Sequence, residues 1–266
     1  MVQSVTRALE LLEQVATHED WVGVRELARE VGLKAPTAHN LLRTLASKRF
    51  LEFDEQSGRY RVGLAVLLLA RRVERLPRLA AFARPYLERV FAEVGETTVV
   101  CALIAGRVVI VDHRQGNQPV SVAHDDGVIE HPHTLASGKL LLAFCDRPAQ
   151  RRYAKGEPLG RLGPNVPRTV GELLDDLRKV RSRRYAETVN ARGYGIGAVA
   201  VPVFGPSDEI EVTIACSAPL SRFGRERRRQ VLSRLFEVAD EMARSLGGSA
   251  RPVARKDSGK KRGAQA

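Results

Sequence analysis

The side chains best suited to reading a nucleic acid lie in a segment that has no acidic residue, from Val31 to Leu51. An asparagine can pair with adenine through two hydrogen bonds, and an arginine can pair with guanine in the same way. Asn40 and Arg43 are three residues apart, so on a helix they lie on one face. The segment therefore predicts a helix that reads DNA bases, although a chance gap in acidic residues on a solvated face is the alternative.

We expect further contacts with DNA from the turn before this helix and from a hairpin after it. Lys34 and Thr37 stand where the start of a helix meets phosphate, and Arg59 and Arg61 would reach the backbone or a minor groove. The predicted DNA-binding residues are Arg25, Lys34, Pro36, Thr37, His39, Asn40, Arg43, Thr44, Lys48, Arg59 and Arg61.

A second group with chemical potential is a run of histidines and aspartates in the middle of the chain. Its members fall within a short stretch and are His113, His124, His131 and His133, with Asp112, Asp125 and Asp126 among them. Such residues could hold Zn²⁺, but their spacing matches no standard metal motif. We predict neither a metal site nor a cofactor, and a metal-sensing regulator that uses the His113–His133 region stays open as the alternative function. No Ser-His-Asp or Cys-His arrangement stands out, so we do not expect an enzyme.

The DNA-reading residues need a small helical scaffold, and the first sixty residues provide its pattern. Apolar residues at helical spacing predict three helices, with Ser4 as the cap of the first and Pro36 in the first turn of the third. Gly32 ends the second helix after about two turns. Two short strands over 50–53 and 59–62, joined by a DEQSG turn, complete a winged helix-turn-helix.

The rest of the chain predicts a linker helix and an α/β domain. Residues 64–76 are apolar and then basic, and we expect Pro77 to end this helix. Burial against a partner subunit would explain so apolar a helix, with packing on its own domain as the alternative. Pro85 would lie in the first turn or at a kink of the next helix, and Thr134 and Thr169 would cap two later ones. The expected strands are 97–104, 108–113, 199–204 and 209–217, and the final helix is 222–246.

Composition sets the class of protein. The chain has 266 residues, of which 44% are hydrophobic and 28% charged, which is typical of one large or two smaller globular domains. We find no apolar run long enough to span a membrane and no signal peptide. Three separated cysteines favour neither disulfides nor a zinc site, so we expect a cytoplasmic protein. The net charge is +12, and residues 249–266 carry six Lys/Arg against one acid, which predicts a disordered basic tail.

Several motifs, met in order along residues 3–248, resemble those of the IclR-type bacterial transcriptional regulators. They are Gln3-Ser4-Val5 with Arg7-Ala8-Leu9, TAHNLLRTL at 37–45, GRYRVG at 58–63, His133-Thr134 with Ser137-Gly138-Lys139, Arg184-Tyr185-Ala186, and AVPVF at 200–204. The resemblance implies an α/β two-domain fold. It divides into a winged helix-turn-helix DNA-binding domain (1–63), a linker and dimerisation helix (64–77), a GAF-like α/β effector-binding domain (78–248) and the basic tail (249–266).

The same resemblance implies a regulator, which we expect to be a repressor, with an activator as the open alternative. Its expected partners are double-stranded operator DNA, a small organic acid as effector, and a second copy of the chain, as a dimer or a dimer of dimers. The effector residues carried over are Ala136, Ser137, Gly138, Asn190, Ala198, Ala215 and Ser217. A helix N-terminus and two serines offer hydrogen-bond donors to a carboxylate, although each small residue could simply serve packing. The chain departs from the family at Pro36 and Asn40, where Ser and Arg are common, and over 187–192, where acidic residues are usual.

Overall fold

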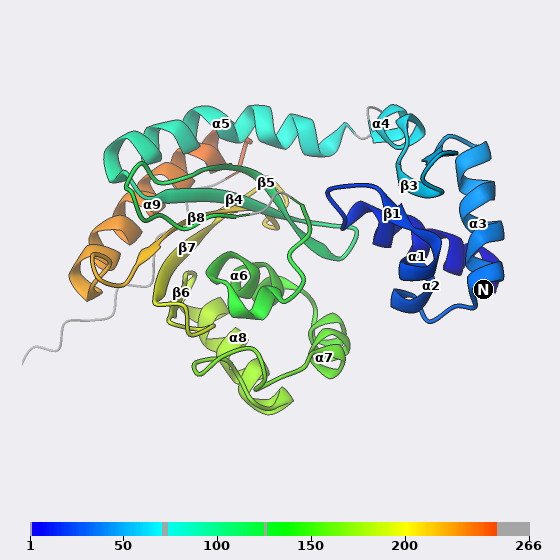
Figure 1. Ribbon diagram of the computed structural model, residues 1–266. Helices are drawn as coiled ribbons and strands as arrows, with labels where there is room; N and C mark the ends of the chain where they lie inside the picture. The colour runs from blue at the N-terminus through cyan, green and yellow to red at the C-terminus, as the bar shows by residue number, and fades with distance from the viewer. Residues whose placement is uncertain (1, 71–73, 125–126, 249–266) are drawn as a thin grey trace, which may run out of the picture. The chain divides into compact units, whose positions relative to one another are not determined.

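The computed structural model describes residues 2–70, 74–124 and 127–248 (Figure 1). The chain divides into two compact units, Met1–Arg75 and Leu76–Ala266, each with its own hydrophobic core. The predicted fold class is confirmed: a winged helix-turn-helix, a linker helix and an α/β domain. The basic tail, and with it the expectation of disorder, lies outside the described residues, as do Asp125 and Asp126.

The first unit is a winged helix-turn-helix. Its helices are α1 (Gln3–Ala16), α2 (Val24–Glu30) and α3 (Ala35–Ser47). Its antiparallel sheet has the order β1-β3-β2, from β1 (Val22–Gly23), β2 (Leu51–Asp54) and β3 (Arg59–Val62). Its core contains one fully buried side chain from each of α1, α2, α3 and β3, namely Leu11, Leu27, Leu42 and Tyr60. Packing among these side chains fixes the orientation of α3.

Local chemistry explains the ends of these helices, with one correction. Gly32 adopts a φ of +68° directly after α2, a conformation that costs glycine little. Pro36 lies in the first turn of α3, as predicted. The prediction that Ser4 caps α1 is wrong, because α1 begins at Gln3 and Val2 holds the cap position without a side-chain hydrogen bond.

A five-stranded antiparallel sheet forms the centre of the second unit. Its strand order is β5-β4-β8-β7-β6. The strands are β4 (Thr97–Ile104), β5 (Arg107–Arg114), β6 (Ala186–Val189), β7 (Ile196–Phe204) and β8 (Ile210–Pro219). Ala105 and Gly106 join β4 to β5 with φ values of +50° and +78°, the left-handed pair that a tight hairpin requires.

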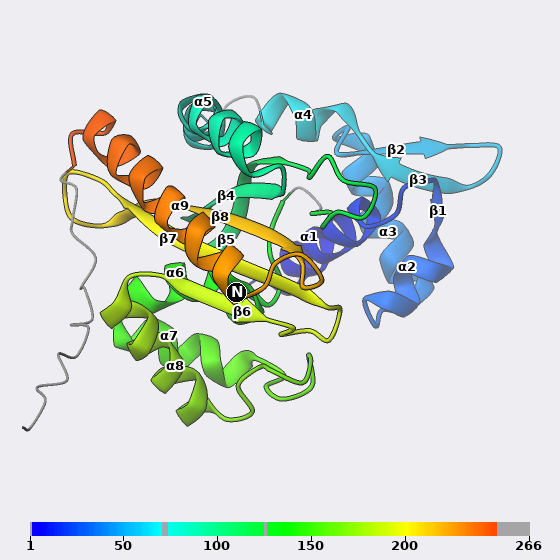
Figure 2. The ribbon, with the colours of Figure 1, turned by 90° about the vertical axis from the view of Figure 1, so that its left-hand side faces the viewer.

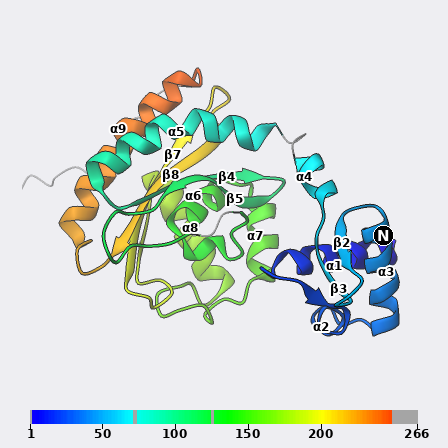
Figure 3. The ribbon, with the colours of Figure 1, turned by 45° about the horizontal axis from the view of Figure 1, so that its top comes forward.

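Helices cover both faces of this sheet (Figures 2 and 3). α5 (Arg75–Val94) and α9 (Arg225–Ser245) pack on one face; α6 (Ala136–Phe144), α7 (Arg147–Gly156) and α8 (Val170–Arg183) form the layer on the other. Along β8 the larger Ile214 and Cys216 point to the α5–α9 side, whereas Ala215 points to α6. Small residues on the α6 side leave room for a cavity.

The helix predicted over 64–76 is wrong at its C-terminal end. α4 spans Leu64–Ala70, Glu74 is outside any helix, and α5 begins at Arg75. Pro77 therefore lies in the first turn of α5 rather than after a helix. The first N–H groups of a helix have no intrahelical acceptor, so proline costs nothing there. Pro85 lies well inside α5 rather than in its first turn, and it is exposed, so the carbonyl that it leaves unpaired can reach water.

The two predicted threonine caps have different outcomes. Thr169 accepts a hydrogen bond from the Glu172 amide at 3.1 Å and is the N-cap of α8, as expected. Thr134 does not cap α6, whose N-cap is Leu135 without a side-chain hydrogen bond. Thr134 instead belongs to a short 3₁₀ turn, η1 (Pro132–Thr134), and its hydroxyl donates to the His131 carbonyl at 2.8 Å.

Candidate functional site

The exposed face of α3 is the first candidate site. Ala38 and Leu42 are buried beneath the helix, which turns Asn40 and Arg43 outward. The Asn40 side chain forms no hydrogen bond with any residue in the described ranges, whereas the Thr44 hydroxyl donates to the Asn40 carbonyl at 2.8 Å. The predicted residues that are exposed on or beside this face are Lys34, Pro36, Thr37, His39, Asn40, Arg43, Thr44 and Lys48, and Arg25 is exposed on α2.

The two arginines of the wing are exposed but held by neighbours. Arg59 donates from Nη1 to the Trp21 carbonyl at 3.1 Å. Arg61 donates from Nε to Glu52 at 2.7 Å, and its guanidinium stacks on the Trp21 ring at 4.5 Å. A guanidinium has five N–H donors, so each arginine keeps donors for another anion. These contacts fix the direction of the wing and leave it competent to bind phosphate.

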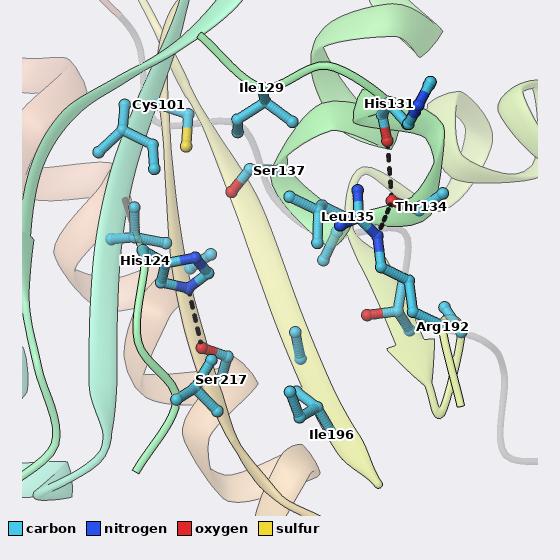
Figure 4. Close-up of a pocket in the computed structure, with 18 of the residues that line it drawn as sticks. Cys101, His124, Ile129, His131, Thr134, Leu135, Ser137, Arg192, Ile196 and Ser217 are labelled. Carbon is cyan, nitrogen blue, oxygen red and sulfur yellow. Dashed lines mark hydrogen bonds between the residues drawn. The ribbon is translucent and has the colours of Figure 1, made fainter. Parts of the chain in front are cut away.

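The second candidate site is a cavity of about 510 Å³ in the second unit (Figure 4). It lies between the start of α6 and the strands β4, β7 and β8, where the small side chains leave space. Its apolar wall includes Val99, Ile110, Ile129 and Ile196. Of the residues carried over from the family, those that line it are Ala136, Ser137, Asn190, Ala198, Ala215 and Ser217.

Gly138 does not line the cavity. A Cβ atom at this position would lie 2.1 Å from the Pro132 carbonyl oxygen, so the glycine allows η1 to pack tightly on α6. Asn190 has a φ of +50° and accepts the Gly195 amide at 2.8 Å through its side chain, which shapes the turn between β6 and β7. Gly138 therefore positions the cavity wall, and Asn190 both shapes and lines it.

The cavity holds several polar groups that face an otherwise apolar space. The Ser137 hydroxyl is buried beside the Cys101 thiol, a weak hydrogen-bonding group, and has no other hydrogen-bond partner among the described residues. No side chain caps α6, so the amides of its first turn are open to a ligand. Ser217 pairs with His124 Nε2 at 3.3 Å, and Arg192 donates from Nε to the Thr134 hydroxyl at 2.9 Å (Figure 4). Burial raises the pKa of the Cys101 thiol to about 12, which keeps it neutral.

This arrangement suits a negatively charged ligand. Arg192 is a half-buried cation at the cavity, and its guanidinium forms no ion pair within the described part of the chain. A helix N-terminus and the Ser137 hydroxyl add uncharged donors. A carboxylate could accept from all of these groups.

Arg192, Thr134 and His124 are among the cavity residues that were not predicted to bind the effector, as are Glu130, His131, Thr188 and Tyr194. The basic Arg192 lies in the segment where the family usually has acidic side chains. This departure is the sequence feature that could have identified Arg192 as a cavity residue. His124 was considered only as a metal ligand, because its proximity to Ser217 depends on contact between distant segments of chain.

His131 and His133 both lie near the Glu157 carboxylate, and His133 Nδ1 is 3.6 Å from its Oε2. His131 Nδ1 lies 2.7 Å from Glu157, and His133 Nδ1 lies 2.6 Å from the Tyr153 hydroxyl. Burial, together with the charges of His131, Lys139 and Arg192, lowers the pKa of His133 to about 4. Within residues 2–70, 74–124 and 127–248, no group of three or more His, Cys, Asp or Glu is placed to hold a metal.

Within the described ranges, no helix is both long and apolar enough to cross a membrane. This agrees with the absence of an apolar run of that length in the sequence.

Two family models match the chain. The model described as the IclR helix-turn-helix domain matches residues 4–55, and the model described as the bacterial transcriptional regulator IclR C-terminal domain matches residues 73–244. Among curated proteins, the HTH-type transcriptional regulator BhcR of Paracoccus denitrificans is 26% identical, with 98% of this chain and 91% of that protein covered. The transcriptional repressor IclR of Escherichia coli is 25% identical, with 93% and 91% covered.

Solved structures give the same result for the fold. A putative IclR regulator from Silicibacter superposes with a TM-score of 0.76 at 25% identity, covering 94% of this chain and 98% of that one. An IclR homologue from Microbacterium hydrocarbonoxydans, solved with 4-hydroxybenzoate, superposes with a TM-score of 0.75 at 22% identity, covering 92% and 99%.

Proposed function

The chain belongs to the IclR family of bacterial transcriptional regulators and is not an enzyme, and from this premise we propose that it is a repressor whose hold on operator DNA is released by a small organic acid. The names of two relatives, the transcriptional repressor IclR and the acetate operon repressor, support the direction of regulation. The proposal assigns residues 1–63 to DNA binding, 64–77 to linkage and dimerisation, and 78–248 to effector binding.

For the DNA contacts, the proposal assigns base reading to α3 and phosphate contacts to its flanks and the wing. Asn40 and Arg43 are exposed side by side on α3, and Asn40 has no partner within the described residues. An asparagine and an arginine in a major groove favour adenine and guanine. Lys34, Lys48 and Arg59 would then contact phosphates and set the register.

The organic acid is supported above all by one observation: the buried Ser137 hydroxyl faces the cavity with no hydrogen-bond partner in the described residues other than the weak Cys101 thiol. A buried polar group without a partner is costly, so a ligand that accepts its hydrogen bond gains that energy. Arg192 supplies the positive charge. A cavity of about 510 Å³ has room for an apolar body beyond the carboxylate, within the usual size of ligand pockets. The 4-hydroxybenzoate bound to the Microbacterium homologue is such an acid.

The proposal includes a homodimer formed through α4. Leu64, Leu67, Leu68 and Leu69 are each exposed by half or more, and no residue of α4 is buried. A second copy of the chain would remove this apolar surface from water. Dimeric helix-turn-helix proteins bind two half-sites at a fixed spacing, so a dimer also fits sequence-specific binding.

Binding of the purified chain to the DNA upstream of its own coding region tests the proposal. The titration is run with and without a panel of monocarboxylic acids, from short aliphatic to aromatic ones. We expect one class of acid to weaken specific binding by about 5- to 150-fold, the usual range of coupling between two sites. Arg192→Gln should reduce the response to the acid and leave DNA binding without acid unchanged. Specific binding that no acid changes would refute the effector proposal.

A further inference from the structure

Helix α7 carries four cationic side chains and no acidic one. Arg147, Arg151, Arg152 and Lys155 are all exposed. At 100° per residue they fall within an arc of about 140° on one side of the helix. Gln150 and Ala154 of the same helix are buried, and Gln150 donates to the carbonyls of Leu142 and Ala143. We call these four side chains the α7 basic face.

The cations of this face lack the partners that arginines elsewhere in the second unit have. None of the four side chains forms a hydrogen bond or an ion pair with a residue that the structure describes. On the opposite layer, by contrast, carboxylates pair with several arginines of α5, of α9 and of the loop before α9, although Arg225 at the start of α9 has no such pair among the described residues. The pairs there are Arg89–Glu241 at 2.6 Å, Arg234–Glu93 at 2.5 Å and Arg222–Glu96 at 2.6 Å. The basic face is therefore a local feature and not simply a result of the net charge.

These cations also act against the stability of their own helix. Arg147 and Arg151, and again Arg151 and Lys155, are like charges four residues apart, a spacing at which they repel. Arg147 lies in the first turn, where the helix dipole disfavours a positive charge. Since local stability does not explain the arrangement, an external anion is the better explanation.

We propose that the α7 basic face is a second DNA-contacting surface, which binds the phosphates of duplex DNA that flanks the operator. This proposal depends on one part of the proposed function, namely that α3 binds the operator. Arg147, Arg151 and Lys155 follow one another at about 6 Å along the helix axis. A DNA strand presents a phosphate about every 3.4 Å of its axis, so one strand can neutralise several of these cations at once, whereas a small anion neutralises one.

The test compares two duplexes and two matched double variants. One duplex is trimmed to the operator sequence that α3 reads, and the other carries about 20 further base pairs on each side, a length of about 68 Å. Arg151→Ala with Lys155→Ala removes two cations of α7, and alanine favours the helix that must be retained. Arg107→Ala with Arg225→Ala is the control, since it removes two exposed cations without an ion-pair partner in the described residues of the same unit.

We expect the salt dependence of binding to separate these variants. On the extended duplex, the plot of log affinity against log salt should become shallower by about 2 for each bound copy of the α7 variant and stay unchanged for the control. On the trimmed duplex, both variants should match the original chain. Unchanged slopes on both duplexes, equal losses in both variants, or equal losses on both duplexes would each overturn the proposal. Specific binding of the original chain to the trimmed duplex measures operator recognition by α3 alone. Loss of this binding would contradict the proposed function, independently of the result for α7.

Discussion

Asn40 is the residue from which we expect most of the base specificity, because of its amide side chain and its position on α3. It is exposed on α3 and has no partner in the described residues, so it is ready to pair with a base edge. We expect Asn40→Ala to weaken binding to the cognate operator by about 1–3 kcal/mol. Fluorescence anisotropy on the operator and on a scrambled duplex of equal length measures this loss.

Binding to the scrambled duplex is the control for Asn40, because phosphate contacts do not depend on sequence. It should change little, since Asn40 is uncharged. An equal loss on both duplexes would mean that Asn40 contacts phosphate or supports the fold instead of reading a base.

Ser137 leads to a prediction in which stability and function change in opposite directions. Its buried hydroxyl has no partner within the described chain except the weak Cys101 thiol, so Ser137→Ala removes a polar group that is poorly satisfied in the unliganded state. We expect the free energy of unfolding to rise by about 1 kcal/mol and the affinity for the acid to fall by about 10-fold. Denaturant unfolding and calorimetric titration measure the two quantities. A destabilised variant would show that the hydroxyl is already satisfied without ligand.

His133 predicts how stability depends on pH. Its pKa is lowered to about 4 by burial first and then by nearby positive charges, whereas in the unfolded chain it titrates near its ordinary value of 6.5. Below that value the unfolded chain binds a proton that the folded chain does not, so stability is complete above it and is lost as the pH falls toward 4. Between about pH 7 and pH 5 the loss should be about 2 kcal/mol.

The variant His133→Gln isolates this contribution, because glutamine fills a similar space and does not titrate. Denaturant unfolding at several pH values should show a flatter curve for the variant than for the original chain. Parallel curves would mean that His133 does not stay neutral in the folded state.

The difference between residues that sequence reasoning found and those that it missed has a physical cause. Asn40 and Arg43 lie within one helix, so periodicity alone predicts that they share a face. His124 meets Ser217 across 93 residues of chain, and Arg192 meets Thr134 across 58, so no local pattern brings them together. Without the family resemblance, the cavity residues on three strands and one helix would also have remained unconnected.

At the scale of elements, two candidate caps make a matched pair. Thr169 accepts the Glu172 amide at the start of α8, whereas Ser4 lies inside α1 and caps nothing. We therefore expect Thr169→Ala to lower the free energy of unfolding of the second unit by about 1 kcal/mol. Ser4→Ala should change the stability of the first unit by less than about half of that. Thermal unfolding of both variants measures this, and equal effects would contradict the assignment of the caps.

Two helix ends were predicted wrongly because the residue types at those positions are compatible with more than one local structure. Pro77 follows an apolar run, where a proline normally ends a helix. Proline is also common in the first turn of a helix. The break in helical structure before Arg75 places Pro77 in the first turn of α5. Thr134 has the right side chain for a cap of α6, but its backbone is part of η1, which packs on α6 through Gly138. In both cases the tertiary environment chose between two local solutions.

At the scale of the whole molecule, the chain holds a DNA-reading unit and a cavity-bearing unit with separate cores. Hydrophobic periodicity and turn residues predicted most helices and strands of both units, but the predicted elements did not include β1, β6 or α7. The proposed repressor also requires communication between the units, which no single element carries. It would appear as a free energy of coupling between the acid and DNA.

That coupling gives a prediction that depends on neither site alone. If the acid weakens operator binding by a given factor, the operator must weaken acid binding by the same factor, because both describe one thermodynamic cycle. For the proposed repressor we expect a factor of about 5 to 150 in each direction. Calorimetric titration of the acid into the free chain and into the chain saturated with operator, compared with DNA titrations at zero and saturating acid, measures both factors. Arg192→Gln should lower the acid affinity in both states while Asn40→Ala should lower only the operator affinity. If the acid leaves operator binding unchanged and the operator leaves acid binding unchanged, the two sites are not coupled, and the repressor mechanism proposed for this chain would then be wrong.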